Sequence, residues 1–248
     1  MIHGDDFTVL GDRLQLDWFR AQIAMRYEVK MRGRLGPSGD DKKSIRILNR
    51  VVQWTPEGIR YEADQRHAEI IVQQLGMEKA NPVSTPGIKP SEEVRTDGDE
   101  EPLEPRDATR YRAITARGLY IAQDRTDIQY AVKELSRWMS KPTLRDWRML
   151  KRLGRYLVDK TREVMLYGYQ EKRSYIDAWV DTDFAGCRRT RKSTSGGVIL
   201  FGSHLLKSWS TTQAILALSS GEAEYYGMVR GGSMPLGTRA FWQTWRYR

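Results

Sequence analysis

Two sets of carboxylates and one row of arginines are the residues whose types and spacing could do chemistry in this sequence. Asp5 and Asp6 are adjacent and precede an apolar stretch that begins at Phe7. Adjacent carboxylates on a tight hairpin can bind Mg²⁺, which prefers hard oxygen ligands, although such pairs also occur on ordinary loops. Two-metal phosphoryl transfer would need at least one more carboxylate from another strand.

The second carboxylate set lies near the other end of the chain. Asp181 and Asp183 follow a predicted strand over 175–180, and Glu222 and Glu224 lie in the first turns of a predicted helix. Residues two apart share a face in a strand but not on a helix, so only one of the two glutamates can face Asp181. A strand aspartate and a helix glutamate that converge would form half of a carboxylate metal cage.

The arginine row comprises Arg145, Arg148, Arg152 and Arg155. At helical spacing these residues form a ridge roughly 15 Å long, while the leucines between them predict a buried face on the same helix. Such a ridge suits the phosphates of a nucleic acid. The alternative is a solvated helix face with an excess of charge.

The charge is unevenly distributed along the 248 residues, whose net charge is +9. Residues 91–107 hold eight acidic and two basic side chains, so this segment carries −6 and the remainder carries +15. The length fits one or two domains, and the strongly basic remainder favours an acidic partner, nucleic acid first. Five prolines between 81 and 107 mark the same stretch as a linker.

Several classes of protein are disfavoured. The longest apolar run, Val198–Phe201, is too short to cross a bilayer, and the acidic residues near Met1 argue against a signal peptide. Cys187 is the single cysteine, so no intramolecular disulfide and no cysteine zinc cluster are expected. We therefore expect an intracellular protein, in the nucleus or the cytoplasm.

The elements that must position these residues follow from apolar periodicity. We expect helices over 17–27, 64–75, 128–139 and 144–157, a strand over 44–54 with a second hairpin arm at 59–62, and strands over 175–180, 197–201, 205–209 and 214–218. Asp64 can cap the second of these helices and Gly76 can end it, and Ser219 or Ser220 can cap the last helix. The order predicts an α+β fold.

Four motifs near the carboxyl end resemble the ribonuclease H domain of copia-type LTR retrotransposon polyproteins. Residues 217–225 (ALSSGEAEY) resemble the family's LSS-x-EAEY, and residues 180–186 (VDTDFAG) resemble its sDaDwAG. Residues 192–197 (KSTSGG) resemble its kSTSGy, and Ser208-Trp209-Ser210 with Gln213 resembles WkSkkQ. The four occur in the family's order and at its spacing.

The resemblance extends towards the amino end. Residues 111–128 are similar to the family's connection, with Thr126 where proline is usual, and residues 81–86 (NPVSTP) are similar to the end of its reverse transcriptase. His3-Gly4-Asp5-Asp6 falls at the polymerase YVDD box, with His and Gly replacing Tyr and Val. The resemblance implies a reverse-transcriptase palm and thumb remnant over 1–80, an acidic linker over 81–107, a helical connection over 108–170, and an incomplete ribonuclease H-like mixed sheet with a helix over 171–248.

The resemblance also implies roles for the carboxylates. Asp5 and Asp6 match the metal-binding pair of the polymerase, and Asp181 and Glu224 match two ribonuclease H ligands, with Glu222 the alternative to Glu224. The family uses Mg²⁺ at both sites, for deoxynucleotide addition and for hydrolysis of RNA in an RNA–DNA hybrid. No aspartate follows Glu224, so we expect weak or absent Mg²⁺ binding and no activity from this chain alone.

Two functional hypotheses follow. In the first, the chain is a fragment of a retrotransposon polymerase and ribonuclease H that acts on RNA–DNA hybrids together with the rest of the polyprotein. In the second, it is a retained, non-catalytic module that binds a hybrid or a duplex through the arginine row. A relic that folds poorly is a third reading, because an open sheet edge favours aggregation.

Overall fold

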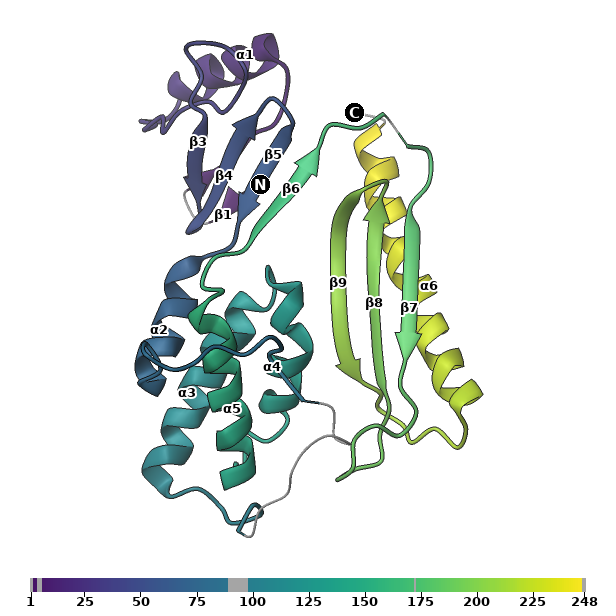
Figure 1. Ribbon diagram of the computed structural model, residues 1–248. Helices are drawn as coiled ribbons and strands as arrows, with labels where there is room; N and C mark the ends of the chain where they lie inside the picture. Colours follow the sequence, from purple (N-terminus) through teal and green to yellow (C-terminus); the bar gives the residue numbers. More distant parts are fainter. Residues whose placement is uncertain (1, 4–5, 89–97, 172, 247–248) are drawn as a thin grey trace.

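The computed structural model describes residues 2–3, 6–88, 98–171 and 173–246. This part of the chain is of the α+β class, as the sequence predicts (Figure 1). An amino-terminal sheet adjoins a bundle of helices, and a second sheet with one long helix lies beside that bundle. Among the described residues, no helix is both long enough and apolar enough to cross a membrane.

The amino-terminal part contains short strands and one helix. They are β1 (Ile2–His3), β2 (Asp6–Phe7), α1 (Arg13–Ala24), β3 (Ser44–Ile47), β4 (Arg50–Thr55) and β5 (Gly58–Glu62). The strand expected over 44–54 is instead a hairpin, because Leu48 and Asn49 adopt φ angles of 47° and 66° and reverse the chain. Two residues with positive φ form the turn whose twist matches that of the flanking strands.

The fourth strand of this sheet comes from far downstream. β6 (Val164–Gly168) pairs antiparallel with β5, with Leu166 opposite Arg60. The order β3-β4-β5-β6 therefore unites segments that lie on either side of the helical bundle in the sequence.

The bundle lies between β5 and β6 in the sequence. It consists of α2 (Gln65–Leu75), α3 (Pro105–Ile121), the 3₁₀ turn η1 (Thr126–Ile128), α4 (Gln129–Ser136) and α5 (Leu144–Val158). As predicted, Asp64 caps α2 by accepting the N–H of Arg66, and Gly76 ends that helix in the left-handed conformation. α5 begins with a capping box formed by Thr143 and Asp146.

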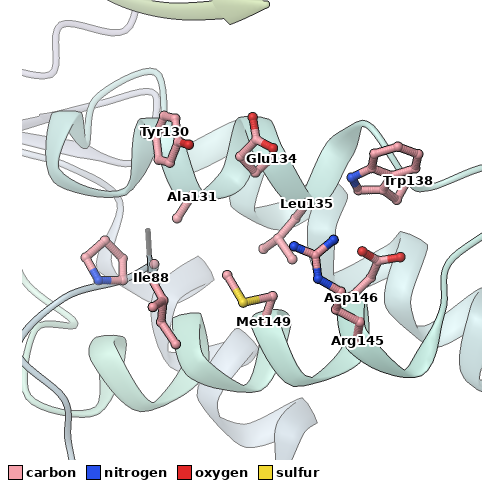
Figure 2. A pocket seen from close by; sticks show the side chains of 11 residues that line it. Ile88, Tyr130, Ala131, Glu134, Leu135, Trp138, Arg145, Asp146 and Met149 are labelled. Atoms are coloured by element: carbon pink, nitrogen blue, oxygen red, sulfur yellow. The ribbon is translucent and has the colours of Figure 1, made fainter. Parts of the chain in front are cut away.

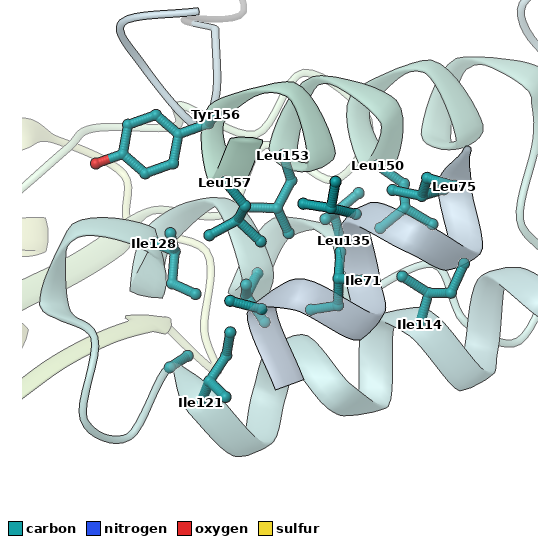
Figure 3. Close-up of a cluster of buried hydrophobic side chains, with 14 of the residues drawn as sticks. Ile71, Leu75, Ile114, Ile121, Ile128, Leu135, Leu150, Leu153, Tyr156 and Leu157 are labelled. Carbon is teal, nitrogen blue, oxygen red and sulfur yellow. The ribbon is translucent and has the colours of Figure 1, made fainter. Parts of the chain in front are cut away.

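The main hydrophobic core lies between these helices (Figure 3). Each helix contributes a fully buried side chain, among them Ile71 of α2, Ile114 of α3, Val132 of α4 and Leu153 of α5. Burying such a side chain stabilises the fold by roughly 1.5–3 kcal/mol. α2 precedes the acidic stretch in the sequence and the other helices follow it. The shared core therefore packs α5, which carries the arginines, against helices from before and after that stretch.

The carboxyl-terminal sheet has the order β7-β8-β9 and carries α6 on one face (Figure 1). Its elements are β7 (Asp177–Thr182), β8 (Thr194–Phe201), β9 (His204–Thr212) and α6 (Ser220–Arg246). Gly227 and Gly231 let α6 approach β7 closely, because a Cβ at either position would collide with Thr182 or Val180. The sheet expected to be mixed is antiparallel throughout the described residues.

The fourth strand expected over 214–218 is not formed. This segment is irregular backbone between β9 and α6, and Ile215 and Leu218 are 58% and 88% exposed. A strand needs a neighbour for its N–H and C=O groups, and apolar residues alone do not supply one. The chain instead enters α6 at once, because the Ser219 hydroxyl accepts the N–H of Glu222 at 3.1 Å and caps the helix, as the sequence predicts.

Candidate carboxylate and nucleic-acid-binding sites

The polymerase-like carboxylates lie at the amino-terminal hairpin. Asp5 lies outside the described residues, whereas Asp6 lies in β2 opposite His3. The carboxylate of Asp6 is exposed, and its Oδ1 is 3.3 Å from Nη2 of Arg32. An exposed pair of this kind contributes little to stability because water screens it.

Asp181 lies in β7, opposite Gly196 of β8. The neighbouring Val180 and Thr182 face α6, so strand alternation directs Asp181 to the other face of the sheet. That face forms one wall of a cleft of about 620 Å³, and Tyr130 of α4 lines it from the bundle. Glu224 is exposed on α6, which covers the opposite face, so the two carboxylates belong to different layers.

The two neighbouring acids have local structural partners. Glu222 accepts the backbone N–H of Leu218 at 2.7 Å and the Tyr226 hydroxyl at 2.9 Å, and these hydrogen bonds lower the pKa of Glu222. Asp183 accepts a short hydrogen bond from the N–H of Thr194. Both side chains therefore shape the ends of secondary-structure elements.

The cleft beside Asp181 combines aromatic and polar groups. Trp179, two residues before Asp181 on the same face, is 66% exposed, and Ser208 and Ser210 of β9 supply hydroxyls. Burial raises the pKa of Tyr130 to about 12, with a further contribution from the charge of Glu134. Sequence reasoning missed Trp179 and Tyr130, although the spacing of Trp179 from Asp181 places both on one strand face.

The carboxylates do not fit the magnesium site that the family resemblance implies. Among the described residues, no group of three or more His, Cys, Asp and Glu side chains is placed to hold a metal ion. Asp181 lies on the face of the sheet away from α6, and Glu224 lies on α6 itself. A shared metal requires oxygen ligands that converge on one point. We therefore derive no catalytic step through Mg²⁺ in this chain.

The arginine row forms on α5 as predicted, but it contacts protein. Arg148 Nη2 lies 2.5 Å from Asp99 Oδ1, Arg152 Nη2 donates to the Thr85 hydroxyl at 2.8 Å, and Arg155 Nε donates to the Asn81 carbonyl at 2.8 Å. All three guanidinium partners belong to the stretch that the sequence marks as a linker. The four arginines are half-buried, so the row is partly covered.

The first arginine of the row occupies a different setting. Arg145 lines a cavity of about 60 Å³ between α4 and α5, together with Ile88, Leu135 and Met149 (Figure 2). Ligand pockets in proteins usually enclose about 300 Å³ or more. This cavity is therefore a packing gap at the helix interface, and Arg145 lies beside it.

A buried arginine, Arg125, has a structural role within residues 111–128, the segment that is similar to the family's connection. Arg125 is 2% exposed and donates to both carboxylate oxygens of Asp127, at 2.9 and 2.6 Å. Its third contact is the Lys160 carbonyl at 2.8 Å, and the Tyr156 hydroxyl donates to Asp127 at 2.9 Å. Burial would raise the pKa of Asp127, but the hydrogen bonds from Arg125 outweigh it and lower that pKa. These residues tie η1 to the end of α5.

Comparison with known proteins defines the class. An uncharacterized mitochondrial protein, AtMg00810 of Arabidopsis thaliana, is 34% identical over 72% of this chain and 71% of its own length. The retrovirus-related Pol polyprotein from transposon RE2 of the same plant is 31% identical over 94% of this chain. The corresponding polyprotein from transposon TNT 1-94 of Nicotiana tabacum is 24% identical over 98%. No family model and no solved structure matches the chain.

The chain thus belongs to the family of that mitochondrial protein, and over most of its length it is homologous to retrotransposon Pol polyproteins. It spans only 15% of the RE2 polyprotein and 18% of the TNT 1-94 polyprotein.

Proposed function

We propose that this chain is a nucleic-acid-binding portion of a copia-type retrotransposon Pol polyprotein. In this assignment residues 1–80 correspond to the end of the reverse transcriptase, 81–107 to a linker, 108–170 to the connection, and 171–248 to the start of the ribonuclease H domain. Its partner would be an RNA–DNA hybrid or a duplex, handled together with the rest of the polyprotein. The ordered motifs and the homology to Pol polyproteins support this assignment.

The observation that carries the binding proposal is the placement of Arg148, Arg152 and Arg155 along one side of α5. The shared core holds this helix rigidly, so the guanidinium groups keep a fixed spacing. Arginine binds phosphate oxygens through a planar fork of N–H donors, and a rigid row can follow successive phosphates of a backbone.

We also propose that the chain does not cleave nucleic acid by itself. The described residues form no group of three or more side chains that could hold a metal ion, and Asp181 faces away from α6, the helix that carries Glu224. Binding without catalysis is the alternative function that this geometry favours, and it predicts that Asp181→Asn leaves the affinity for a hybrid unchanged.

Fluorescence anisotropy with a short labelled RNA–DNA hybrid, measured between 50 and 200 mM KCl, tests the proposal. We expect affinity to fall steeply with salt. The triple variant R148Q/R152Q/R155Q should make the negative slope of log association constant against log salt concentration shallower by about 2.7, or roughly 0.9 per lost phosphate contact. The matched control R13Q/R20Q/R26Q removes the same charge from exposed positions in α1 and directly after it.

Equal effects of the two triple variants would contradict binding by the arginine row. Affinity that does not respond to salt would contradict nucleic-acid binding as a whole. Mg²⁺-dependent cleavage of the RNA strand by this chain, abolished by Asp181→Asn, would overturn the proposed inactivity.

A further inference from the structure

The chain returns to the beginning of α5 after the stretch 89–97, which lies outside the described residues. We define the acidic strap as Gly98–Glu104, a segment with four acidic side chains and no basic one. Its backbone passes beside the residues that open α5, where Pro102 forms an isolated antiparallel bridge with Thr143.

The strap supplies hydrogen-bond acceptors for the first backbone N–H groups of α5. The first N–H groups of a helix have no partner within the helix, and here those of Leu144 and Arg145 donate to the carbonyls of Glu101 and Asp99, at 3.0 and 3.1 Å. In the reverse direction, the N–H of Leu103 donates to the carbonyl of Pro142 at 2.9 Å. Negative charge beside this helix terminus is also favoured by the helix dipole.

The strap also places a carboxylate on the arginine row. The Asp99 side chain is only 9% exposed, and its Oδ1 lies 2.5 Å from Arg148 Nη2. Glu100 extends the negative surface, with its Oε2 3.7 Å from Arg189 Nη2. A carboxylate and a phosphate offer the same kind of anionic oxygens to a guanidinium group, so Asp99 occupies the position that a nucleic-acid phosphate would take.

We infer that the acidic strap is an intramolecular competitor that covers the amino-terminal part of the arginine row through the Asp99–Arg148 ion pair and must be displaced before Arg148 binds a nucleic-acid backbone. This inference rests on the proposed nucleic-acid binding. The strap places negative charge against the cationic helix, so it would weaken contact of Arg148 with nucleic acid.

A charge-matched pair of variants tests the competition. Asp99→Asn removes the strap carboxylate, while Asp40→Asn removes an equally charged carboxylate that is 94% exposed and lies 3.8 Å from Arg13. Because both variants raise the net charge by one, a general electrostatic effect changes their affinities equally. We expect D99N to bind the RNA–DNA hybrid roughly three- to ten-fold more tightly than D40N, with a salt slope steeper by about 0.9.

A double-mutant cycle locates the effect. In the R148Q background, the gain from D99N over D40N should disappear, since the arginine that it releases is absent. A gain that persists there, or equal affinities of D99N and D40N in the native background, overturns the inference while leaving nucleic-acid binding intact. If neither the native chain nor any variant binds the hybrid at 50 mM KCl, the proposed function itself fails.

Hydrogen exchange on the native chain supplies a readout that does not depend on whether D99N folds. The amides of Leu103, Leu144 and Arg145 form the strap contacts, so saturating hybrid should accelerate their exchange. Unchanged or slower exchange of these amides while the hybrid is bound overturns displacement of the strap. The amide of Tyr61, within the β4–β5 ladder, serves as the internal control.

Discussion

Arg162 donates two hydrogen bonds to the two carboxylate oxygens of Glu62, at 2.7 and 2.9 Å, across 100 positions of sequence. Glu62 is the last residue of β5, and Arg162 precedes β6, which pairs with that strand. The ion pair therefore aligns a distant segment with the edge of the amino-terminal sheet.

This ion pair should make the fold sensitive to acid. The hydrogen bonds from Arg162 lower the pKa of Glu62 below its ordinary value, so the unfolded chain takes up a proton more readily than the folded chain does. The stabilisation is complete above the ordinary pKa of a glutamate and is lost as pH falls through the lowered, folded-state value. Urea unfolding across the acid range should therefore show a flatter pH dependence for Glu62→Gln; an unaltered acid limb would contradict this.

The Arg125–Asp127 pair should be costly to break from either side. Asp127→Asn leaves a buried guanidinium without its anionic partner, and we expect the free energy of unfolding to fall by about 3 kcal/mol. Arg125→Lys should also destabilise, because an ammonium group cannot reproduce the planar fork. Urea denaturation followed by tryptophan fluorescence measures both, with the exposed Arg13→Lys as control. Losses within error of that control would refute the structural role.

Two glycines should respond to alanine in opposite directions. A Cβ at Gly197 would overlap the indole of Trp209 and lie 2.7 Å from the Trp179 carbonyl oxygen, so Gly197→Ala should destabilise by at least about 2 kcal/mol. Gly232 lies within α6 with no atom near its Cβ position, and Gly232→Ala should stabilise by about 0.5–1 kcal/mol. Thermal unfolding of the two variants tests the packing of the carboxyl-terminal sheet, and equal melting temperatures would contradict it.

Cys187 should react faster at neutral pH than an ordinary cysteine. Burial alone would raise the pKa of its thiol, but the hydrogen bonds from Thr190 and Arg137 outweigh burial and lower that pKa. Arg137 Nη2 lies 3.0 Å from the sulfur. The pH profile of iodoacetamide alkylation should therefore have its midpoint below that of a model thiol, and Arg137→Gln should move it upward. An identical profile for the variant would exclude the proposed cause.

Local chemistry made much of the fold predictable, whereas long-range pairing did not. The cap at Asp64, the left-handed Gly76 and the apolar stripe of α5 each depend on residues within a few positions. β6 escaped prediction because the five residues of Val164–Gly168 show no clear period, and only β5, about a hundred residues earlier, makes them a strand. The prediction for residues 214–218 was wrong for the opposite reason, since their apolar character predicts a strand for which the described part of the chain supplies no partner.

The candidate site shows the same division. Spacing correctly placed the four arginines on one side of a helix. It could not reveal that the guanidinium groups of three of them contact Asp99, Thr85 and Asn81. Likewise, strand alternation gives the direction of Asp181 only once the position of α6 is known. The chemical roles of Asp5, Asp6, Asp181 and Glu224 stay predictions.

The pairing of β5 with β6 also sets an order of events during synthesis. Residues 58–62 leave the ribosome long before residues 164–168, and the entire helical bundle is made in between. Until β6 arrives, β5 presents a bare edge, and closing so long a loop is slow compared with forming the local helices. A nascent chain from which α5 has emerged but β6 has not would therefore hold a finished bundle beside an unfinished sheet. Chaperone capture or mispairing with another chain matters most in that interval.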